Sequence, residues 1–427
     1  MTMPSNRSAA SRASGAAADW PARYAATRAA TVALAAGLSP EDCALQSMPD
    51  ASPVKWHLAH TSWFFETFVL APNLAGYQAF NPAFRVLFNS YYVQVGARHP
   101  RPERGLISRP GLAEVCAYRS HVDAGIARWL ESGAAAPAAL ALLDLGVHHE
   151  QQHQELILTD LKHLFSRNPA RPAYRSLATP ACGAAPALRW QAFPAGVQEI
   201  GHAGGGFCFD NEQPRHRTYL RGFELAARLV TNGEYLAFIE DQGYERPELW
   251  LSDGWDACRA QGWTAPAYWE QGSDGWRIFT LGGMRALDPA EPVTHVSFYE
   301  ADAFARWAGA RLPTEAEWEV LAAREPADGN FVESGALHPV PATDAGTLQQ
   351  VFGDAWEWTA SAYLGYPGYR PASGAVGEYN GKFMVNQFVL RGGSCATPRA
   401  HIRATYRNFF PPAARWQFSG IRLARDA

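Results

Sequence analysis

Two histidines four residues apart are the best-placed metal ligands in this chain. His149 and His153 lie in the segment HEQQHQE, within an apolar pattern of helical period. Residues at this spacing lie on one face of an α-helix, about 6 Å apart, which suits two ligands of one ion. The pair therefore predicts a metal-binding helix, although such pairs also occur by chance on solvated helices.

A third candidate ligand, His60, comes from an earlier aromatic segment. The Ser-Pro step at 52–53 is typical of a helix start, and an aromatic run follows it. On this helix His60 shares a face with Trp56 and Trp63, so its imidazole is expected in an apolar interior, where a metal ion is one possible partner. His57 lies only one turn away, and spacing alone also permits it as a ligand.

Three other polar residues of the second helix are not expected to be ligands. His148 and His163 lie outside the stripe shared by His149 and His153, so we expect structural or surface roles for both. Glu155 lies about 200° from His153 on the helical wheel, which favours a supporting or capping role over coordination.

The composition is that of a soluble globular protein with two domains. The chain has 427 residues, 47% of them hydrophobic, and a formal net charge of -4. It contains no basic run that would bind nucleic acid and no apolar segment approaching the ~20 residues of a membrane span. Six cysteines occur without CxxC spacing, which argues against a disulfide scaffold and favours a cytoplasmic protein with reduced thiols.

The first part of the chain has the period of amphipathic helices. Within residues 19–168, helices are expected at 20–45, 53–70, 110–132 and 137–166. They predict a four-helix bundle, a scaffold that builds metal sites from facing helices. Residues 1–18, rich in Ala, Ser and Arg, are expected to be a disordered tail. The long polar and aromatic loop 89–105 has a length more typical of functional loops than of simple connections.

The second part has a different pattern. Residues 169–194 are rich in Pro, Ala and Gly and predict a linker. From 195 to 427, short apolar runs are broken by Gly, Pro, Asn and Asp, which predicts an irregular mixed domain. Helices are expected near 298–309 and after Thr314, which forms a capping box with Glu317.

Several motifs resemble those of known families. The bundle with its HEQQH segment resembles the DinB superfamily of metal-binding bundles. Five segments of the second part resemble the formylglycine-generating-enzyme domain, which has a C-type-lectin-like fold: RLVTNGEY (228–235), PVTHVS (292–297), RLPTEAEWE (311–319), GDAWEWT (353–359) and LRGGS (390–394). The pairing resembles the EgtB family of ergothioneine-biosynthesis sulfoxide synthases. It implies an α+β chain, with a DinB-like four-helix bundle followed by a C-type-lectin-like domain.

The resemblance also implies the cofactor. In this family His60, His149 and His153 would bind a non-haem Fe(II), with O2 as co-substrate. Three histidines leave metal positions open for sulfur and O2. Spacing alone fits zinc equally well, so a zinc-dependent DinB-type thiol transferase is the alternative from another reaction class. A non-catalytic ligand-binding protein is a third.

The implied substrate is hercynine, trimethylated histidine. Its quaternary ammonium cannot donate hydrogen bonds and would be recognised by aromatic faces. Asn408 and Phe409 match family positions that contact hercynine, and Gln152 is expected to point toward the same substrate. Phe410 and Trp416 supply further aromatic faces. The alternative for Phe409 and Phe410 is packing at the domain interface.

The sulfur donor stays open. Members that use γ-glutamylcysteine have an acidic residue at the position of Phe410, so this chain is expected to use cysteine or a related thiol. A selenosugar donor, as in the related selenoneine synthases, is also compatible with the absence of an acidic residue at position 410. Arg98 and Arg101 are candidates for pairing with a donor carboxylate, as is the nearby Arg104.

The resemblance to the family places the proton donor in the long loop 89–105. Cysteine-using members carry there a tyrosine that acts as proton donor, which implies a catalytic role for Tyr91 or Tyr92. Because adjacent side chains usually point in different directions, one of the two is expected to dominate.

Overall fold

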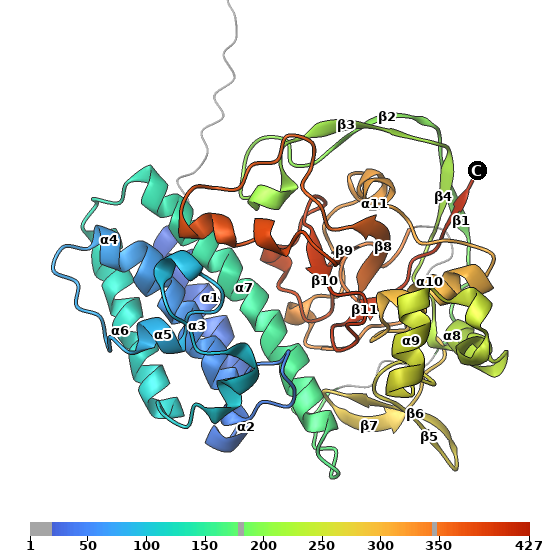
Figure 1. Cartoon of the computed structure of the whole chain (residues 1–427), viewed down its shortest axis with the longest axis horizontal. Coiled ribbons are helices and arrows are strands. Elements are labelled where there is room, and N and C mark those ends of the chain that lie inside the picture. Colours follow the sequence, from blue (N-terminus) through green and yellow to red (C-terminus); the bar gives the residue numbers. More distant parts are fainter. Residues whose placement is uncertain (1–18, 178–182, 344–347) are drawn as a thin grey trace, which may run out of the picture.

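The computed structural model describes residues 19–177, 183–343 and 348–427. They form a helical bundle and a mixed domain, which lie side by side along one long helix, α7 (Figure 1). The predicted α+β class is therefore confirmed. The expected tail, 1–18, lies outside the described residues. Among the described residues, no helix is long and apolar enough to cross a membrane.

Four long helices build the bundle. Their bounds are α1 Trp20–Ala35, α3 Val54–Phe65, α6 Leu112–Glu131 and α7 Pro137–Ser166. Short helical turns connect them: α2 Pro40–Ala44, the π-helical turn η1 Glu66–Leu70, α4 Ala71–Asn73, α5 Phe84–Leu87, and the 3-10 turns η2 Val93–Val95 and η3 Arg101–Leu106.

The first segment holds two helices, so the prediction of one helix at 20–45 was wrong. α1 ends at Ala35, because Gly37 adopts a φ of 89° and turns the chain. Ser39 then begins α2: its side chain accepts a hydrogen bond from Asp42 N, and the Asp42 carboxylate accepts one from Ser39 N.

Helix α3 is the centre of the bundle. Every residue from Val54 to Phe65 is buried, and the helix packs against α1, α6 and α7. A helix that is largely apolar on all sides is stable only in such a position. The aromatic run that follows the Ser-Pro step therefore forms the core around His60.

A buried ion network joins three of the long helices. The Glu150 carboxylate of α7 accepts hydrogen bonds from Arg28 Nη1 at 2.8 Å and from Arg119 Nη2 at 2.9 Å. Arg28 also pairs with Asp123 at 2.7 Å. Each charge thus has a partner, which is the condition under which charged groups are tolerated in a protein interior.

The described residues of the second domain form four small sheets and four α-helices, together with several 3-10 turns. One of two three-stranded sheets has the order β1 Trp190–Phe193, β4 Phe223–Ala226, β12 Ala424–Asp426, and the other has the order β5 Trp269–Gly272, β6 Gly275–Thr280, β7 Gly283–Ala286. The four-stranded sheet has the order β10 Asn408–Phe410, β9 Phe388–Arg391, β8 Trp356–Ala362, β11 Ser419–Gly420. The remaining strands are β2 Gly196–Ile200 and β3 His216–Leu220.

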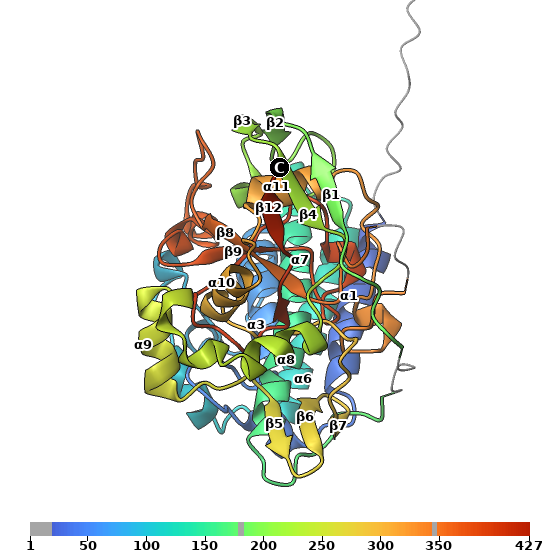
Figure 2. The same cartoon turned by 90° about the vertical axis from the view of Figure 1, so that its right-hand side faces the viewer.

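The helices of this domain are α8 Asn232–Glu240, α9 Ser252–Gln261, α10 Phe298–Trp307 and α11 Glu315–Ala322. The last two are the helices that the sequence predicted. The capping box of α11 is present, since Thr314 accepts a hydrogen bond from Glu317 N and Glu317 accepts one from Thr314 N. Figure 2 shows the β2–β3 pair and the β5–β7 sheet at opposite ends of the domain.

The expected linker, 169–194, contacts both domains. Its last residues form β1, which pairs antiparallel with β4 of the second domain. Before it, the Tyr174 hydroxyl donates to the Leu34 carbonyl of α1, and Tyr174 N donates to the Leu281 carbonyl. This segment is therefore anchored at Tyr174 and at β1.

Helix α7 also binds the second domain directly. Glu155, for which we expect a supporting or capping role rather than coordination, accepts hydrogen bonds from Trp356 Nε1 at 2.6 Å and Ser394 Oγ at 2.6 Å. About two helical turns further along, Lys162 Nζ lies 2.6 Å from His295 Nε2. The side of α7 that bears Glu155 faces the second domain, which explains why this carboxylate is turned away from the histidines.

The ion network of Glu150 generates a stability prediction. Glu150→Ala leaves two buried guanidiniums without their shared partner, which costs about 3–5 kcal/mol of stability in comparable networks. We expect the urea midpoint of the metal-free protein to fall clearly, measured by circular dichroism. Glu131→Ala, at the exposed end of α6, is the control and should leave the midpoint unchanged. Equal midpoints for the two variants would contradict the network's role.

Candidate metal centre and the surrounding cleft

Three histidines from two helices converge in the interior. His60 of α3 and His149 and His153 of α7 are buried, and their candidate ligand nitrogens lie within 4.8 Å of one another. Their ring centroids are 4.6 to 4.9 Å apart. The packing of α3 against α7 therefore brings together the three residues that the sequence analysis named as ligands.

The free nitrogens of this trio fit a metal ion. His60 Nδ1 donates to the Phe88 carbonyl at 2.6 Å, so His60 Nε2 carries the lone pair, and it is buried without a hydrogen-bond partner among the described residues. His149 Nε2 and His153 Nε2 lie 3.1 Å apart. Two nitrogens bound to one ion at ~2.1 Å and a right angle would be ~3 Å apart. A shared cation would thus satisfy groups that are costly to bury unpaired.

His57 lies beside the trio rather than in it. His57 Nε2 donates to Asp160 Oδ2 at 3.0 Å, which leaves His57 Nδ1 as the acceptor of a 2.8 Å hydrogen bond from His153 Nδ1. His153 therefore keeps the lone pair of Nε2 for a metal. Ligand histidines are commonly oriented in this way through their second nitrogen.

Burial keeps the three imidazoles uncharged. It lowers the pKa of His149 to about 3 and lowers the pKa values of His60 and His153 well below the usual value for histidine. The neighbouring imidazoles lower the latter two further. All three side chains are therefore in the neutral form that coordinates metals, at any pH near 7.

Aromatic and cationic side chains surround His60. Its ring stacks on Trp56 with centroids 4.5 Å apart. The guanidinium of Arg104 lies over the Trp56 ring, 3.3 Å from its centroid, and donates a hydrogen bond to Ser52 Oγ at 2.8 Å. Burial lowers the pKa of Arg104 to about 8.

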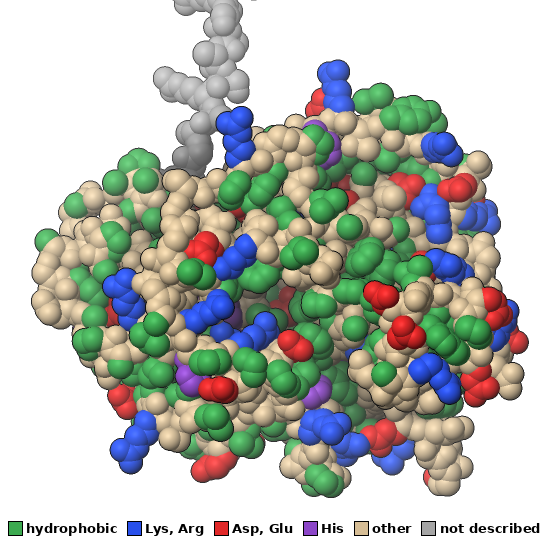
Figure 3. Space-filling view, in the orientation of Figure 1, with side chains coloured by type: hydrophobic (Ala, Val, Ile, Leu, Met, Phe, Trp, Pro, Cys, Tyr) green, Lys and Arg blue, Asp and Glu red, His purple; other side chains and the backbone are tan. Residues whose placement is uncertain are grey.

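The two arginines predicted to bind a donor lie nearer the surface than Arg104. Arg98 and Arg101 are exposed, and the Arg101 guanidinium donates to the Asp50 carbonyl. Figure 3 shows Lys and Arg side chains along the bundle side of a hollow between the two domains. Two arginines of the loop 89–105 are thus bound to the bundle, Arg101 through the Asp50 carbonyl and Arg104 through Ser52.

The second domain approaches the histidines through Tyr379. Its buried ring lies with its centroid 5.5 Å from that of His149, and its hydroxyl donates to Gln152 Oε1. Gln152 Nε2 in turn donates to the Tyr406 hydroxyl at 2.7 Å. Gln152 therefore lies at the junction of the domains, held by two phenols, of which sequence reasoning missed Tyr379. Tyr379 lies in no recognisable motif, and only its closeness to Gln152 in space identifies it.

A further contact crosses the junction behind Gln152. His148 is buried, its Nδ1 lies 3.0 Å from His401 Nδ1, and its ring stacks on Phe207 with centroids 3.8 Å apart. His401 Nε2 reaches the Tyr406 hydroxyl at 3.1 Å. His148 thus has a structural role, one of the two roles expected for it.

Tyr91 and Tyr92 have different surroundings. Tyr92 is fully buried among bundle aromatics, with ring centroids 5.1 Å from Phe68 and 5.5 Å from Trp63. Tyr91 is half-buried and meets the second domain at Phe383, 5.1 Å away, and at Tyr379, 6.4 Å away. Burial raises the pKa of both hydroxyls, so both are protonated at neutral pH.

The predicted substrate residues near the C-terminus divide into two groups. Phe409 stacks on Tyr363 at 4.0 Å and lies 5.9 Å from Phe383, the residue that contacts Tyr91. Asn408 accepts a hydrogen bond from Phe409 N through its own side chain. Phe410 and Trp416 meet edge to face at 5.8 Å and are not linked to the histidines by any described ring contact.

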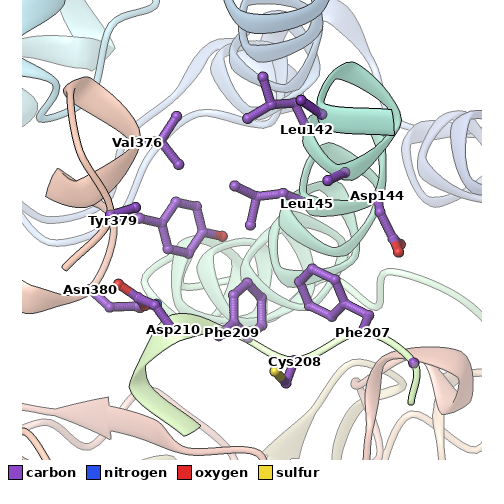
Figure 4. Close-up of a pocket in the computed structure, with 14 residues that line it drawn as sticks. Leu142, Asp144, Leu145, Phe207, Cys208, Phe209, Asp210, Val376, Tyr379 and Asn380 are labelled. Carbon is purple, nitrogen blue, oxygen red and sulfur yellow. The ribbon is translucent and has the colours of Figure 1, made fainter. Parts of the chain in front are cut away.

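A cavity of about 410 Å³ opens beside Tyr379. Figure 4 shows that three distant segments line it: Leu142, Asp144 and Leu145 of α7, Phe207 to Asp210, and Val376, Tyr379 and Asn380. The wall is mostly apolar. Because Tyr379 also contacts His149, the cavity and the histidine trio share this ring as a common wall.

The arrangement of the trio predicts a graded loss of metal binding. His153→Ala removes a ligand, whereas His57→Ala removes only the group that orients it, a change that typically costs about 10–100-fold in affinity. We therefore expect His57→Ala to bind Fe(II) or Co(II) about 10–100-fold more weakly and His153→Ala more weakly still, measured by anaerobic titration. His163→Ala, on the same helix, should bind as the unaltered protein does. Equal affinity in His153→Ala would exclude the trio.

Comparison with known proteins agrees with this two-part architecture. The DinB superfamily model matches residues 23–157, and that of the sulfatase-modifying factor enzyme 1-like domain matches residues 191–352 and 336–427. Hercynine oxygenase of Mycobacterium tuberculosis is 33% identical over 403 residues, 88% of this chain and 92% of the relative.

Two other relatives extend the comparison. Hercynine oxygenase of Mycolicibacterium thermoresistibile is 33% identical over 412 residues, 88% of each chain. Ergothioneine biosynthesis protein 1 of Schizosaccharomyces pombe is 28% identical over 233 residues, 52% of this chain and 28% of the relative. Both domains and their order match along nearly the whole length of the mycobacterial relatives, so this chain belongs to the family of EgtB-type hercynine oxygenases.

Proposed function

We propose that this protein is an Fe(II)- and O2-dependent enzyme that joins a sulfur or selenium atom to the imidazole C2 of hercynine. The observation that carries the proposal is the three-histidine trio placed against the phenols of the second domain, in a chain 33% identical to hercynine oxygenases over 88% of its length. The proposed location is the cytoplasm, in keeping with five free cysteines among the described residues.

Iron would be held by His60, His149 and His153. Three neutral imidazoles leave coordination positions free, and the iron bound there would supply a binding site for the donor sulfur and the redox chemistry for O2. The protein's own contribution is to keep the imidazoles oriented through Phe88 and His57 and to exclude bulk water with Trp56 and other core aromatics.

The proposed reaction balances with one O2. Joining hercynine C2–H to a thiol S–H releases two electrons and two protons, and oxidising the sulfur to a sulfoxide releases two more electrons. O2 takes up all four electrons, with one oxygen atom remaining in the sulfoxide and the other leaving as water. Protons must therefore move from the substrates to oxygen, and a nearby acid would assist this transfer.

Tyr91 is the phenol that we assign to this proton transfer. Its raised pKa keeps the proton on the hydroxyl, and its ring faces Tyr379 and Phe383 at the domain junction. Tyr92 is enclosed by bundle aromatics, which suits a packing role better. Gln152, fixed by Tyr379 and Tyr406, would orient hercynine beside the histidines.

Aromatic faces would hold the trimethylammonium group. Phe409 and Phe383 present such faces next to Tyr91, and Asn408 adds an amide. Phe410 and Trp416 extend the aromatic surface farther from the trio. Attraction of a quaternary ammonium to an aromatic ring is worth about 0.5–2 kcal/mol per contact, so several rings are needed for useful affinity.

The donor is proposed to be cysteine or a related thiol. Phe410 packs on Trp416, and an aromatic residue there offers no carboxylate to a donor amine. Arg98 and Arg101 are the proposed partners of a donor carboxylate, with the buried Arg104 behind them. A selenosugar donor is the second candidate, favoured by the same apolar Phe410, because a sugar carries no amine that needs an acidic partner.

Oxygen uptake tests the proposal. Purified protein loaded with Fe(II) should consume O2 only when hercynine and the correct donor are both present, with one O2 used per hercynine. Cysteine, γ-glutamylcysteine and a selenosugar are supplied in separate reactions, and mass spectrometry identifies the product. Zinc-loaded protein is the matched control and should consume none. Absence of uptake with every donor, together with donor transfer by the zinc form, would instead establish a thiol transferase.

Substitution of the paired tyrosines tests the assignment of the acid. Tyr91→Phe should lower kcat by about 10²–10⁴-fold, the usual contribution of a positioned acid, while metal binding stays unchanged. Tyr92→Phe keeps the packing of the neighbouring ring and should have a much smaller effect. Steady-state kinetics at saturating hercynine measures both. A larger loss in Tyr92→Phe would reverse the assignment.

A further inference from the structure

One carboxylate of the second domain binds the backbone of the long bundle loop. Glu378 Oε2 accepts a hydrogen bond from Val93 N at 2.9 Å, and Glu378 Oε1 accepts one from Gln94 N at 2.9 Å. These two N–H groups belong to η2, the 3-10 turn directly after Tyr91 and Tyr92. Glu378 lies at the end of η8, Ala375–Glu378, and directly precedes Tyr379.

A lysine completes this contact. Lys382 Nζ pairs with the Glu378 carboxylate at 2.8 Å and also donates to the Tyr91 carbonyl. Its ammonium lies 5.0 Å from the centroid of the Tyr91 ring. The four hydrogen bonds that link Glu378, Lys382 and residues 91–94 are called the Glu378–Lys382 latch below.

The latch carries more than an ordinary surface ion pair. Only 14% of the Glu378 side chain is exposed, and both of its oxygens bind N–H groups of another domain. Burial alone would raise the pKa of Glu378, but the hydrogen bonds from Lys382 and the two backbone N–H groups lower it. Such charge-assisted hydrogen bonds are stronger than neutral ones and fix geometry as well as distance.

The residues next to the latch in sequence are the aromatic residues at which the bundle contacts the second domain. Tyr91 lies two residues before the first bonded N–H group, that of Val93, and Tyr379 follows Glu378 directly. Phe383 follows Lys382 and contacts both Tyr91 and Phe409. The latch therefore joins the backbone segments that carry Tyr91, Tyr379 and Phe383, and Tyr379 in turn contacts His149.

We propose that Glu378 and Lys382 are positioning residues, which hold the loop of Tyr91 against Tyr379 and Phe383 so that the proton-donating phenol and the aromatic faces meet beside the histidine trio. The proposal rests on the proposed function for the roles of these phenols. Neither latch residue touches the trio, so both act through the residues that they hold. A misplacement of about 1 Å is enough to cost an enzyme on the order of 100-fold in rate.

Amide hydrogen exchange tests the latch independently of activity. In Glu378→Gln the amides of Val93 and Gln94 should exchange at least about tenfold faster, as expected for loss of charge-assisted hydrogen bonds. The control is Glu333→Gln: Glu333 is an exposed carboxylate that likewise accepts a backbone N–H, from Arg399 at 3.0 Å, but lies outside the latch. Unchanged exchange at Val93 and Gln94 in Glu378→Gln would overturn the proposal.

Kinetics then tests positioning. Glu378→Gln and Lys382→Met should each lower kcat about tenfold or more, with iron content and thermal midpoint unchanged. Lys382→Arg, which keeps the cation and its donors, should restore most of the rate. An active enzyme whose kcat is unaffected despite faster exchange would overturn the positioning role. If the unaltered protein consumes no O2 with hercynine, the proposed function fails, and exchange alone decides whether the latch holds the loop.

Discussion

The burial of α7 on both of its sides is the constraint on which the rest of this molecule depends. The helix carries charged and polar residues, yet it lies between the bundle and the second domain, where water cannot solvate them. Each group therefore needs a protein partner or a metal ion. Glu150 binds the arginines of α1 and α6, whereas Glu155 binds Trp356 and Ser394 of the second domain. His149 and His153 lie against each other and against His60, and His153 also binds His57.

This arrangement makes the site a product of both domains. The bundle supplies the imidazoles and orients them through Asp160, His57 and the Phe88 carbonyl. The second domain supplies the phenols that hold Gln152. Because the domains meet along the helix that bears two of the histidines, any residue that fixes their contact also fixes the site.

The three arginines of the loop 89–105 show how burial gives identical side chains different properties. They lie within seven residues, and nothing in the sequence indicates which of them is buried. In the structure, Arg98 and Arg101 are exposed, while Arg104 packs on Trp56, and burial lowers its pKa to about 8. The burial of Arg104 follows from the contacts of η3 with residues 46–52: Gln46 binds the backbone of Arg101 and Gly105, and Ser52 binds the Arg104 guanidinium.

The sequence by itself determined the order of the long helices, the bounds of most of them, and His149 and His153 as candidate ligands, whereas the choice of His60 over His57 came from the resemblance to the family. The sequence did so because helical period, capping boxes and the spacing of His149 and His153 are local properties, readable within one or two turns. Motifs distributed over the second part were enough to indicate its domain and the family. The break at Gly37 was missed because the apolar period continues across it. Only the tertiary structure decided that His57 orients a ligand, that Glu155 faces away, and that Tyr379 and Tyr406 hold Gln152. These pairings join residues 96 to 254 positions apart, so they depend on how α7 packs against its two neighbours, which no local pattern encodes.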